Sequence, residues 1–292
     1  MSDCHRGNGT AGDEFAHNSL IYKCALEYYL EEGFTYIELG DAEELWENES
    51  FEQIYITHTS VYDLLGRFHD PDPAKTRYLK VWGNHDLDWR DDAGPLRALF
   101  RDIEMHEAII LQYGSQNKGR ILLLHGHQAD PVCSGFRARI SRLLVRKLWS
   151  PLQLFGIGDP TRAAENPGRS NNVDKTLYCF AKKESGNTAY SIIAGHTHRP
   201  VFENLSLTER RCIESGTEIP GISRKDKADS LYYNTGSCVH PRCITGIEIT
   251  MEKPDIPEYR LVKWGYQAGY EVCDAKGCRS YPLAITRTVL EE

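Results

Sequence analysis

The sequence predicts an α/β sandwich, and three features of the chain lead to this prediction. Short apolar segments that end in a glycine-containing turn occur four times, at residues 34–41, 76–86, 119–130 and 189–200. Segments with helical spacing of apolar residues lie before and between them, and the chain becomes rich in β-branched and aromatic residues after residue 200. Strands that alternate with helices are typical of α/β proteins, whose functional loops follow the carboxyl ends of the strands.

Two helices are predicted near the start of the chain. Residues 19–32 place apolar side chains near helical spacing and end before Gly33, a residue type that commonly terminates helices. Residues 52–68 are predicted to form one further helix despite their β-branched residues. In the second half, short runs of Ile, Val, Thr and Tyr predict strands at residues 201–207, 230–239, 244–251, 258–266 and 283–290.

Composition and charge narrow the class of protein. The 292 residues include 34 Lys and Arg and 42 Asp and Glu, a formal net charge of −8 that argues against nucleic acid as a partner. No apolar run reaches the ~18 residues needed to cross a bilayer. The first ten residues contain no apolar stretch of the kind found in signal peptides. We therefore expect a cytoplasmic protein.

The nine cysteines are expected to be free and mostly buried thiols. An odd number of cysteines in a chain without an export signal is typical of reduced thiols. Two pairs, Cys238/Cys243 and Cys273/Cys278, share a C-x4-C spacing. This spacing is wider than that of the usual structural zinc site, so zinc binding by these pairs is the less favoured alternative.

Five short motifs carry residue types that bind divalent metal ions. Along the chain they are Asp3-x-His5, Gly40-Asp41-x-x-Glu44, Gly83-Asn84-His85-Asp86, His125-Gly126-His127 and Gly195-His196-Thr197-His198. An isolated histidine is more often structural than a ligand. Two histidines at i and i+2 after an apolar strand and a glycine reverse that expectation for His196 and His198. The five motifs together indicate a metal centre built at the ends of strands.

In content and order, these motifs resemble those of the calcineurin-like metallophosphoesterase superfamily. The resemblance spans residues 3–198 and implies a four-layer α/β/β/α sandwich of two mixed sheets, with residues 1–292 forming a single domain. It also implies two divalent metal ions bridged by Asp41. The first ion is assigned to Asp3, His5, Asp41 and His198, and the second to Asp41, Asn84, His125 and His196. Imidazole and carboxylate ligands without a thiolate suit Mn2+, which we expect, or Fe, Zn or Co.

The resemblance implies a hydrolytic reaction at this centre. Two metal ions ~3.5–4 Å apart can clamp a phosphate and activate a bridging water as the nucleophile. His85 is then the general acid towards the leaving oxygen, or stabilises the charge of the transition state. Glu44 is expected to orient His85 and to favour its protonated form, whereas Asp86 is expected to fix the turn.

The start of the chain departs from the resemblance. Relatives carry an apolar strand before the Asp-x-His motif, whereas only Met1 and Ser2 precede Asp3. A missing central strand removes backbone hydrogen bonds from a sheet, so the placement of Asp3 and His5 depends on what replaces it. We expect a shortened start rather than an evolved loss of the strand.

Residues 131–188 are predicted to form a helical cap or lid inserted into the domain. The middle of this insertion, residues 160–175, is polar and is interpreted as a loop. A helical insertion at this point is similar to that of UDP-2,3-diacylglucosamine pyrophosphatases, which supports an accessory lid more than that substrate.

The insertion also carries a basic helical face. Arg139, Arg142 and Arg146 share one face at i, i+3 and i+7, beside an apolar face. Three interpretations stay open: a solvated surface, a set of substrate-binding arginines for an anionic or lipidic group, and peripheral docking of residues 136–155 on the inner membrane surface.

The predicted function is metal-dependent hydrolysis of a phosphate mono- or diester or a pyrophosphate bond in a small-molecule, nucleotide or lipid-linked substrate. A protein serine/threonine phosphatase is a less favoured alternative, because Glu44-Leu45-Trp46 stands where that branch has Asp-Arg-Gly. A DNA nuclease is disfavoured by the net charge of −8 and by the lack of a coiled-coil segment. A catalytically silent scaffold on the same fold is the alternative from another class, although this chain retains every ligand motif and His85.

Overall fold

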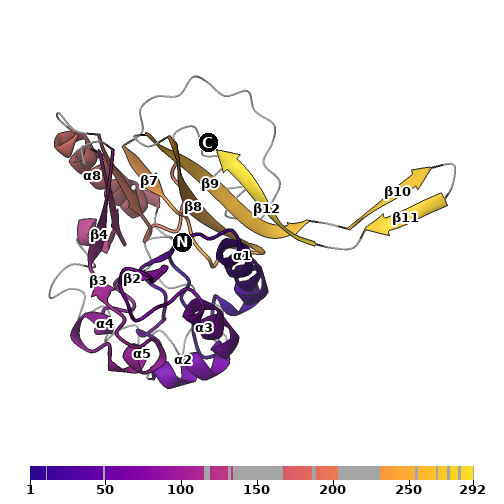
Figure 1. Cartoon of the computed structure of the whole chain (residues 1–292), viewed down its shortest axis with the longest axis horizontal. Coiled ribbons are helices and arrows are strands. Elements are labelled where there is room, and N and C mark those ends of the chain that lie inside the picture. Colours follow the sequence, from indigo (N-terminus) through magenta and orange to yellow (C-terminus); the bar gives the residue numbers. More distant parts are fainter. Residues whose placement is uncertain are drawn as a thin grey trace.

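The structure, a computed structural model, describes residues 1–10, 12–48, 50–114, 119–130, 133, 167–185, 189–202, 231–253, 256–267, 269–274, 277–281 and 284–291. In this part of the chain the fold is a mixed α/β arrangement of several sheets and helices, which confirms the predicted class (Figure 1). Helices α1 to α5 lie together on one side of the molecule, and α8 lies on another side, against β6 and β7.

Two sheets supply the loops on which the predicted ligands lie. The first has the order β1-β2-β3 and is parallel, with β1 (Tyr36–Leu39), β2 (Tyr78–Val81) and β3 (Met105–His106). The second has the order β4-β5-β6-β7 and comprises β4 (Ala108–Tyr113), β5 (Gly119–Leu124), β6 (Tyr190–Ala194) and β7 (Tyr232–Asn234). Strand β4 is antiparallel to β5, and β5, β6 and β7 are parallel. Apolar side chains from β1, β2, β5 and β6 share one buried cluster with Leu261, so these sheets are held against a common core.

The helices of the first half cover the first sheet. Helix α1 (Ser19–Glu31) occupies the predicted range. The helix predicted over residues 52–68 is instead two helices, α2 (Phe51–Thr57) and α3 (Thr59–Gly66), which meet at His58. His58 is buried, and its Nε2 donates to Asp13 Oδ2 at 2.8 Å. This partner lies 45 residues away along the chain, so apolar periodicity does not reveal it. The shorter helices are η1 (Ala16–Asn18), α4 (Asp88–Asp91), α5 (Gly94–Leu99) and η3 (His127–Ala129).

A third, antiparallel sheet comes from the C-terminal part of the chain. It has the order β12-β9-β8, with β8 (Cys243–Lys253), β9 (Ile256–Gln267) and β12 (Ala284–Glu291). Between β9 and β12, strands β10 (Tyr270–Asp274) and β11 (Gly277–Tyr281) form a hairpin that projects from the body of the molecule (Figure 1).

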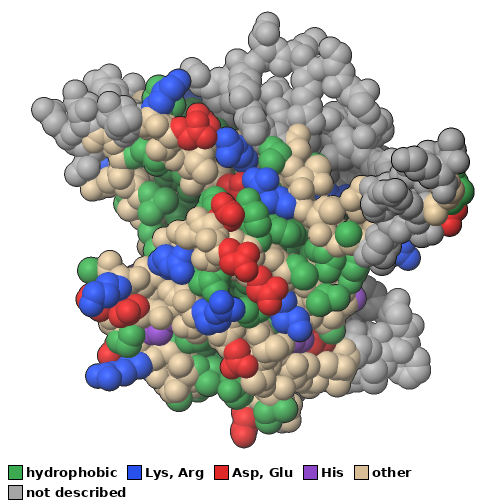
Figure 2. Space-filling view, turned by 45° about the vertical axis from the view of Figure 1, so that its right-hand side comes forward, with side chains coloured by type: hydrophobic (Ala, Val, Ile, Leu, Met, Phe, Trp, Pro, Cys, Tyr) green, Lys and Arg blue, Asp and Glu red, His purple; other side chains and the backbone are tan. Residues whose placement is uncertain are grey.

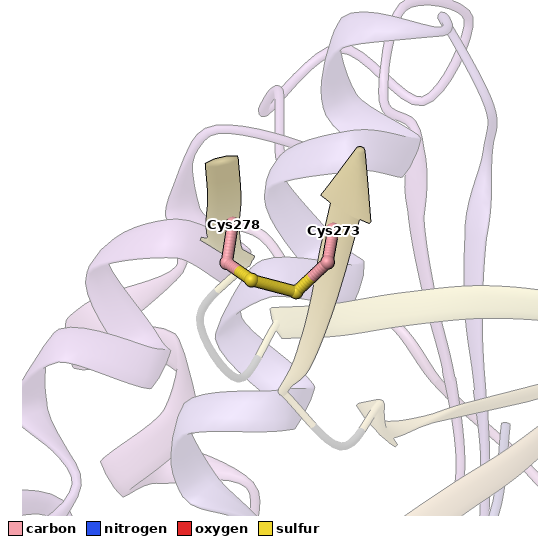
Figure 3. Close-up of a disulfide and its surroundings, with 2 residues drawn as sticks. All are labelled: Cys273 and Cys278. Atoms are coloured by element: carbon pink, nitrogen blue, oxygen red, sulfur yellow. A yellow bond between two sulfur atoms is a disulfide. The ribbon is translucent and has the colours of Figure 1, made fainter. Parts of the chain in front are cut away.

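A disulfide between Cys273 and Cys278 corrects the prediction that all cysteines are free (Figure 3). The two residues face each other directly across the β10–β11 hairpin, with their Cα atoms 4.0 Å apart. A C-x4-C spacing permits this bond only when the segment folds into a hairpin in that register, and the spacing alone does not show the hairpin. The other described cysteines are free, as predicted: Cys4, Cys24, Cys133, Cys179, Cys238 and Cys243.

Helix α8 (Pro167–Glu184) corrects the interpretation of residues 160–175 as a loop for residues 167–175, whereas residues 160–166 lie outside the described part of the chain. Its N-terminal half is polar, but Ser170, Val173, Leu177 and Ala181 form a buried stripe at helical spacing. Three of these side chains, those of Val173, Leu177 and Ala181, join a cluster with β6 and β7. The polar residues therefore occupy the remaining faces of a helix that buries only one narrow face.

The first six residues run beside β1 and the loop that follows it, to which they are joined by backbone hydrogen bonds. Leu39 N–H donates to Met1 O at 2.8 Å, and Asp3 N–H donates to Gly40 O at 3.0 Å. Beyond Met1, a cavity of about 590 Å3 with a mostly apolar lining separates β1 from β8. Packing between these strands is thus incomplete at the Met1 end, whereas the segment that carries Asp3 is held by backbone hydrogen bonds.

A fully buried network of four charges lies under this segment. Arg6 contacts Glu38 at 2.7 Å and Glu43 at 2.6 Å, and Lys80 contacts the same carboxylates at 2.6 and 3.0 Å. Burial opposes ionisation of Glu38 and Glu43, but Arg6 and Lys80 outweigh it and hold the pKa of both carboxyls below the ordinary value. The stability that such a network provides depends on every charge having a partner, because removal of one partner leaves an uncompensated buried charge.

We predict that Lys80→Met destabilises the protein by about 3–5 kcal/mol, the usual cost of breaking a buried ion pair from one side. Lys75→Met is the matched control, because Lys75 pairs with Asp72 at 3.0 Å on a surface where the two side chains are 70% and 46% exposed. The control should lose less than about 1 kcal/mol. Urea denaturation of the two variants measures both values, and equal losses would contradict a structural role of the network.

We also predict that the network makes stability sensitive to acid. Because the pKa of Glu38 and of Glu43 is lower in the folded protein, the unfolded chain binds more protons as the pH falls through about 4.3. Their contribution is complete above about pH 5 and is lost progressively below it. Urea denaturation at a series of pH values should show this fall. The slope should be shallower in Lys80→Met, which lacks one cation that lowers both pKa values.

Candidate metal centre

The structure brings the predicted ligands together from four strand ends and from the start of the chain. Asp41 follows β1, Asn84 follows β2, His125 follows β5, and His196 and His198 follow β6. Among the described residues, four sets of three have potential ligand atoms within 4.8 Å of one another, and two of these sets consist wholly of predicted ligands. They are the first ligand group (Asp3, His5 and His198) and the second ligand group (Asp41, His125 and His196).

In the first ligand group, two imidazole nitrogens face each other. His5 Nδ1 donates to Glu44 Oε2 at 2.7 Å, so the Nε2 of a neutral His5 carries a lone pair. That Nε2 lies 3.1 Å from His198 Nε2, which itself lies 3.2 Å from Asp3 Oδ1. Nitrogen and carboxylate ligand atoms aimed at one point are the arrangement that a bound cation requires.

In the second ligand group, His125 is oriented in the same way. Its Nδ1 donates to Leu39 O at 3.0 Å, which leaves Nε2 for a ligand. This Nε2 lies 3.0 Å from Asp41 Oδ2 but has no hydrogen-bond geometry to any described residue. Asp41 Oδ2 is also 3.8 Å from His5 Nε2, so this carboxylate lies between His125 of the second ligand group and His5 of the first.

Asn84 lies beside the same carboxylate. Its neighbour His85 donates a backbone N–H to Asp41 Oδ1 at 2.8 Å. The side chain of Asn84 is buried, and its Oδ1 has no hydrogen-bond partner among the described residues. An unpaired buried amide oxygen is costly, and coordination to a cation would remove that cost.

The electrostatics of the cluster favour a bound cation. Burial disfavours the charged form of Asp3, but His198 and His125 outweigh it and lower the pKa of Asp3 to about 2. Asp41 is likewise held well below its ordinary pKa, against burial, by His125 and His85. Conversely, Asp41 and Asp3 raise the pKa of His125 to about 9 although burial opposes this. The two buried carboxylates are therefore stabilised by nearby positive charge, and the chemistry of the donor set fits divalent metal ions.

The predicted catalytic pair lies beside the first ligand group. Glu44 Oε1 accepts from His85 Nδ1 at 2.8 Å, while Glu44 Oε2 accepts from His5. The ring of Trp46 stacks on His85 with centroids 4.3 Å apart. His85 therefore has a fixed ring plane and a fixed partner for its Nδ1.

Asp86 fixes the turn, as expected. Its carboxylate accepts from the backbone N–H of Gly83 at 2.6 Å and of Ala42 at 2.8 Å. It thereby ties the loop after β2 to the loop after β1, so that Asn84 and Asp41 keep their relative positions.

The structure adds Asp130 and Trp46 to the site, two residues whose roles the sequence does not indicate. Asp130 Oδ2 accepts from His196 Nε2 at 3.0 Å and from Arg169 Nε at 2.6 Å. These partners are 66 and 39 residues away along the chain, so no local pattern indicates them. The arginines of the predicted basic face, Arg139, Arg142 and Arg146, lie outside the described residues, as does the whole segment 136–155.

Figure 2 shows one face of the molecule, on which Lys and Arg side chains are interspersed with Asp and Glu and form no extended patch of one sign. No described helix is long and apolar enough to cross a membrane.

Comparison with known proteins adds little to the assignment. No family model and no curated protein matches the chain. Among solved structures, the chain is similar to one described as a novel archaeal phosphodiesterase, with 14% identity, a TM-score of 0.40 and coverage of 89% of this chain and 95% of that one. It is also similar to a conserved uncharacterized protein, a predicted phosphoesterase, from Streptococcus pneumoniae TIGR4, with 14% identity, a TM-score of 0.30 and coverage of 96% and 94%. Likenesses this distant do not define a function, which therefore has to be argued from the site.

The glycines of the motifs provide a test of this site. Gly40 has φ +84°, and a Cβ there would lie 2.5 Å from the ring of His125. Gly33 has φ +76° but no atom within 4 Å of such a Cβ. Both Gly→Ala changes carry the ~1–2 kcal/mol cost of the left-handed backbone. Only Gly40→Ala should also displace His125 and abolish binding of manganese by the second ligand group.

Titration calorimetry with MnCl2, combined with thermal unfolding of the metal-free proteins, separates these effects. Retention of normal manganese binding by Gly40→Ala would contradict the position of His125 in the centre.

Proposed function

We propose that the protein is a metal-dependent phosphoesterase that hydrolyses a phosphate mono- or diester or a pyrophosphate bond. The observation that carries this proposal is the convergence of the two ligand groups, with Asp41 of the second group 3.8 Å from His5 of the first and with the backbone of His85 bonded to Asp41. Histidine, carboxylate and amide ligands suit Mn2+ best among the candidates, with Fe, Zn and Co as further options.

The ligands divide between two ions in this proposal. Asp3, His5, His198 and Asp41 hold one ion, and Asp41, Asn84, His125 and His196 hold the other. When bound, two divalent ions supply the positive charge that polarises a phosphoryl group and lowers the pKa of an attacking water. The residues of the chain orient the substrate and move the proton of the leaving group.

His85 is the proton donor to the leaving oxygen in this proposal. Its Nδ1 donates to Glu44, so a protonated ring presents Nε2–H as the second donor. Glu44 is buried and stays ionised, since the imidazoles of His85 and His5 outweigh the effect of burial and lower the pKa of Glu44 well below its ordinary value. A fixed carboxylate behind the ring stabilises the protonated imidazole and holds it towards the substrate.

The proposal also extends to the architecture. We assign residues 1–292 to one phosphoesterase domain with a four-layer α/β/β/α arrangement, in which residues 131–188 form a cap. Of this cap, the structure describes Cys133 and residues 167–185, and α8 packs on the sheet that carries His125 and His196. The substrate is a small phosphorylated or lipid-linked molecule, and nucleic acid is not expected.

We predict that His85→Ala lowers hydrolysis of phenyl phosphate esters by about 10²–10⁴-fold, the usual contribution of a general acid. The loss should be smaller with p-nitrophenyl phosphate and its bis-ester, because p-nitrophenolate leaves without protonation. Manganese content should not change, since His85 is not a proposed ligand.

His106→Ala is the control, because His106 is half-buried on β3 and lies outside the ligand groups. A scaffold without catalysis predicts no hydrolysis by the wild type and no difference between the variants. Loss of bound manganese from His85→Ala would show instead that this residue belongs to the metal centre.

A further inference from the structure

We infer that Asp130 is a positioning residue for the metal ligand His196, and that Arg169 connects this function to helix α8. The inference rests on the proposed function, because it concerns the same metal centre. In this inference, α8 sets the orientation of the ligand His196 through Arg169 and Asp130.

The hydrogen bond between Asp130 and His196 determines which ring nitrogen is free. His196 Nε2 lies 3.0 Å from Asp130 Oδ2, and both side chains are buried. A carboxylate at this distance accepts the Nε2–H, so His196 carries its lone pair on Nδ1. A ligand histidine whose second nitrogen donates to a carboxylate is held in one tautomer and one ring orientation.

Arg169 holds the carboxylate in turn. Its Nε and its Nη2 each lie 2.6 Å from Asp130 Oδ2, and its Nη2 also lies 3.1 Å from Cys133 Sγ. Asp130, Cys133 and His196 could themselves form a set of metal ligands by distance. The guanidinium of Arg169 already supplies the positive charge there, which favours the role of Asp130 as a partner of His196 over that of a ligand.

Helix α8 contacts the ligand loop at a second point. Asp174 accepts from Tyr232 Oη at 2.7 Å and from Thr197 Oγ1 at 3.4 Å. Thr197 stands between the two ligands His196 and His198. Two side chains of α8, one basic and one acidic, thus reach the Gly-His-Thr-His loop, one directly and one through Asp130. A displacement of α8 would therefore change the orientation of His196 and the affinity for the second ion.

The test compares two matched carboxylate–imidazole pairs. Asp130→Asn removes the negative charge beside His196. Asp130→Ala also removes the hydrogen-bond acceptor of His196 Nε2. Asp13→Asn is the control, because Asp13 accepts from the buried His58 at 2.8 Å outside the ligand groups. Arg169→Met keeps Asp130 but releases it from α8. Each full-length, metal-free variant is titrated with MnCl2 by calorimetry, and the visible spectrum is recorded after addition of CoCl2.

We expect Asp130→Ala to weaken binding of one manganese ion by about 10–100-fold, as is usual when the partner of a ligand histidine is removed. Asp130→Asn should lose less affinity, because an amide oxygen still accepts from Nε2. Arg169→Met should lose less than Asp130→Ala. The cobalt spectra of the Asp130 variants should differ from that of the wild type. Asp13→Asn should match the wild type in both measurements, although it also breaks a buried pair.

The outcomes separate this inference from the proposed function. If the wild type binds two manganese ions and Asp130→Ala and Asp130→Asn bind them with unchanged affinity and unchanged cobalt spectra, the inference is wrong and the metal centre stands. If the wild type binds no manganese, both fail. If Asp13→Asn loses as much affinity as Asp130→Asn, the effect is one of general stability and the inference is also wrong.

Discussion

The proposed centre depends on a backbone that brings seven side chains to one point, and this convergence is costly. Among the described residues other than glycine, φ is positive at Asp3 (53°), His5 (48°), Asp41 (50°), His196 (69°) and His198 (57°). Each left-handed residue of this kind costs about 1–3 kcal/mol. Two other described residues, neither of them in the ligand groups, share this conformation. Strain is thus concentrated where ligands must leave a strand end sharply and point at a shared site.

Glycines in the loops also make this convergence possible, because they allow close approach. A Cβ at Gly195 would lie 2.4 Å from Ser2 Oγ, and one at Gly83 would lie 2.2 Å from Asp41 Oδ1. A backbone that lies so close to neighbouring side chains leaves no room for a Cβ at these two positions. The loops pack directly against each other. The buried ion pairs of Arg6 and Lys80 with their two carboxylates lie beneath the loops and support them. The strain is offset by this surrounding structure, which holds the loops in place.

Much of the fold follows from local pattern. Strand ends at residues 39, 81, 124 and 194 and the long helix α1 agree with apolar periodicity and with glycine-containing turns. The errors share one cause, which is that each feature depends on how segments pair or pack in the folded chain. His58, where the predicted helix breaks, bonds to Asp13, helix α8 depends on a narrow stripe buried against β6 and β7, and the Cys273–Cys278 disulfide depends on hairpin register. The neighbouring sequence alone does not show any of these arrangements.

By itself the sequence determined which residue types could bind metal and at which strand ends they stand, because a strand followed by glycine and histidine is a local pattern. Only the tertiary structure decided how these residues are oriented. It paired His5 and His85 through one carboxylate of Glu44, and it placed Asp130 and Arg169 behind His196. Hydrogen bonds between residues dozens of positions apart arise from packing of whole elements, so they become visible only when the chain is folded.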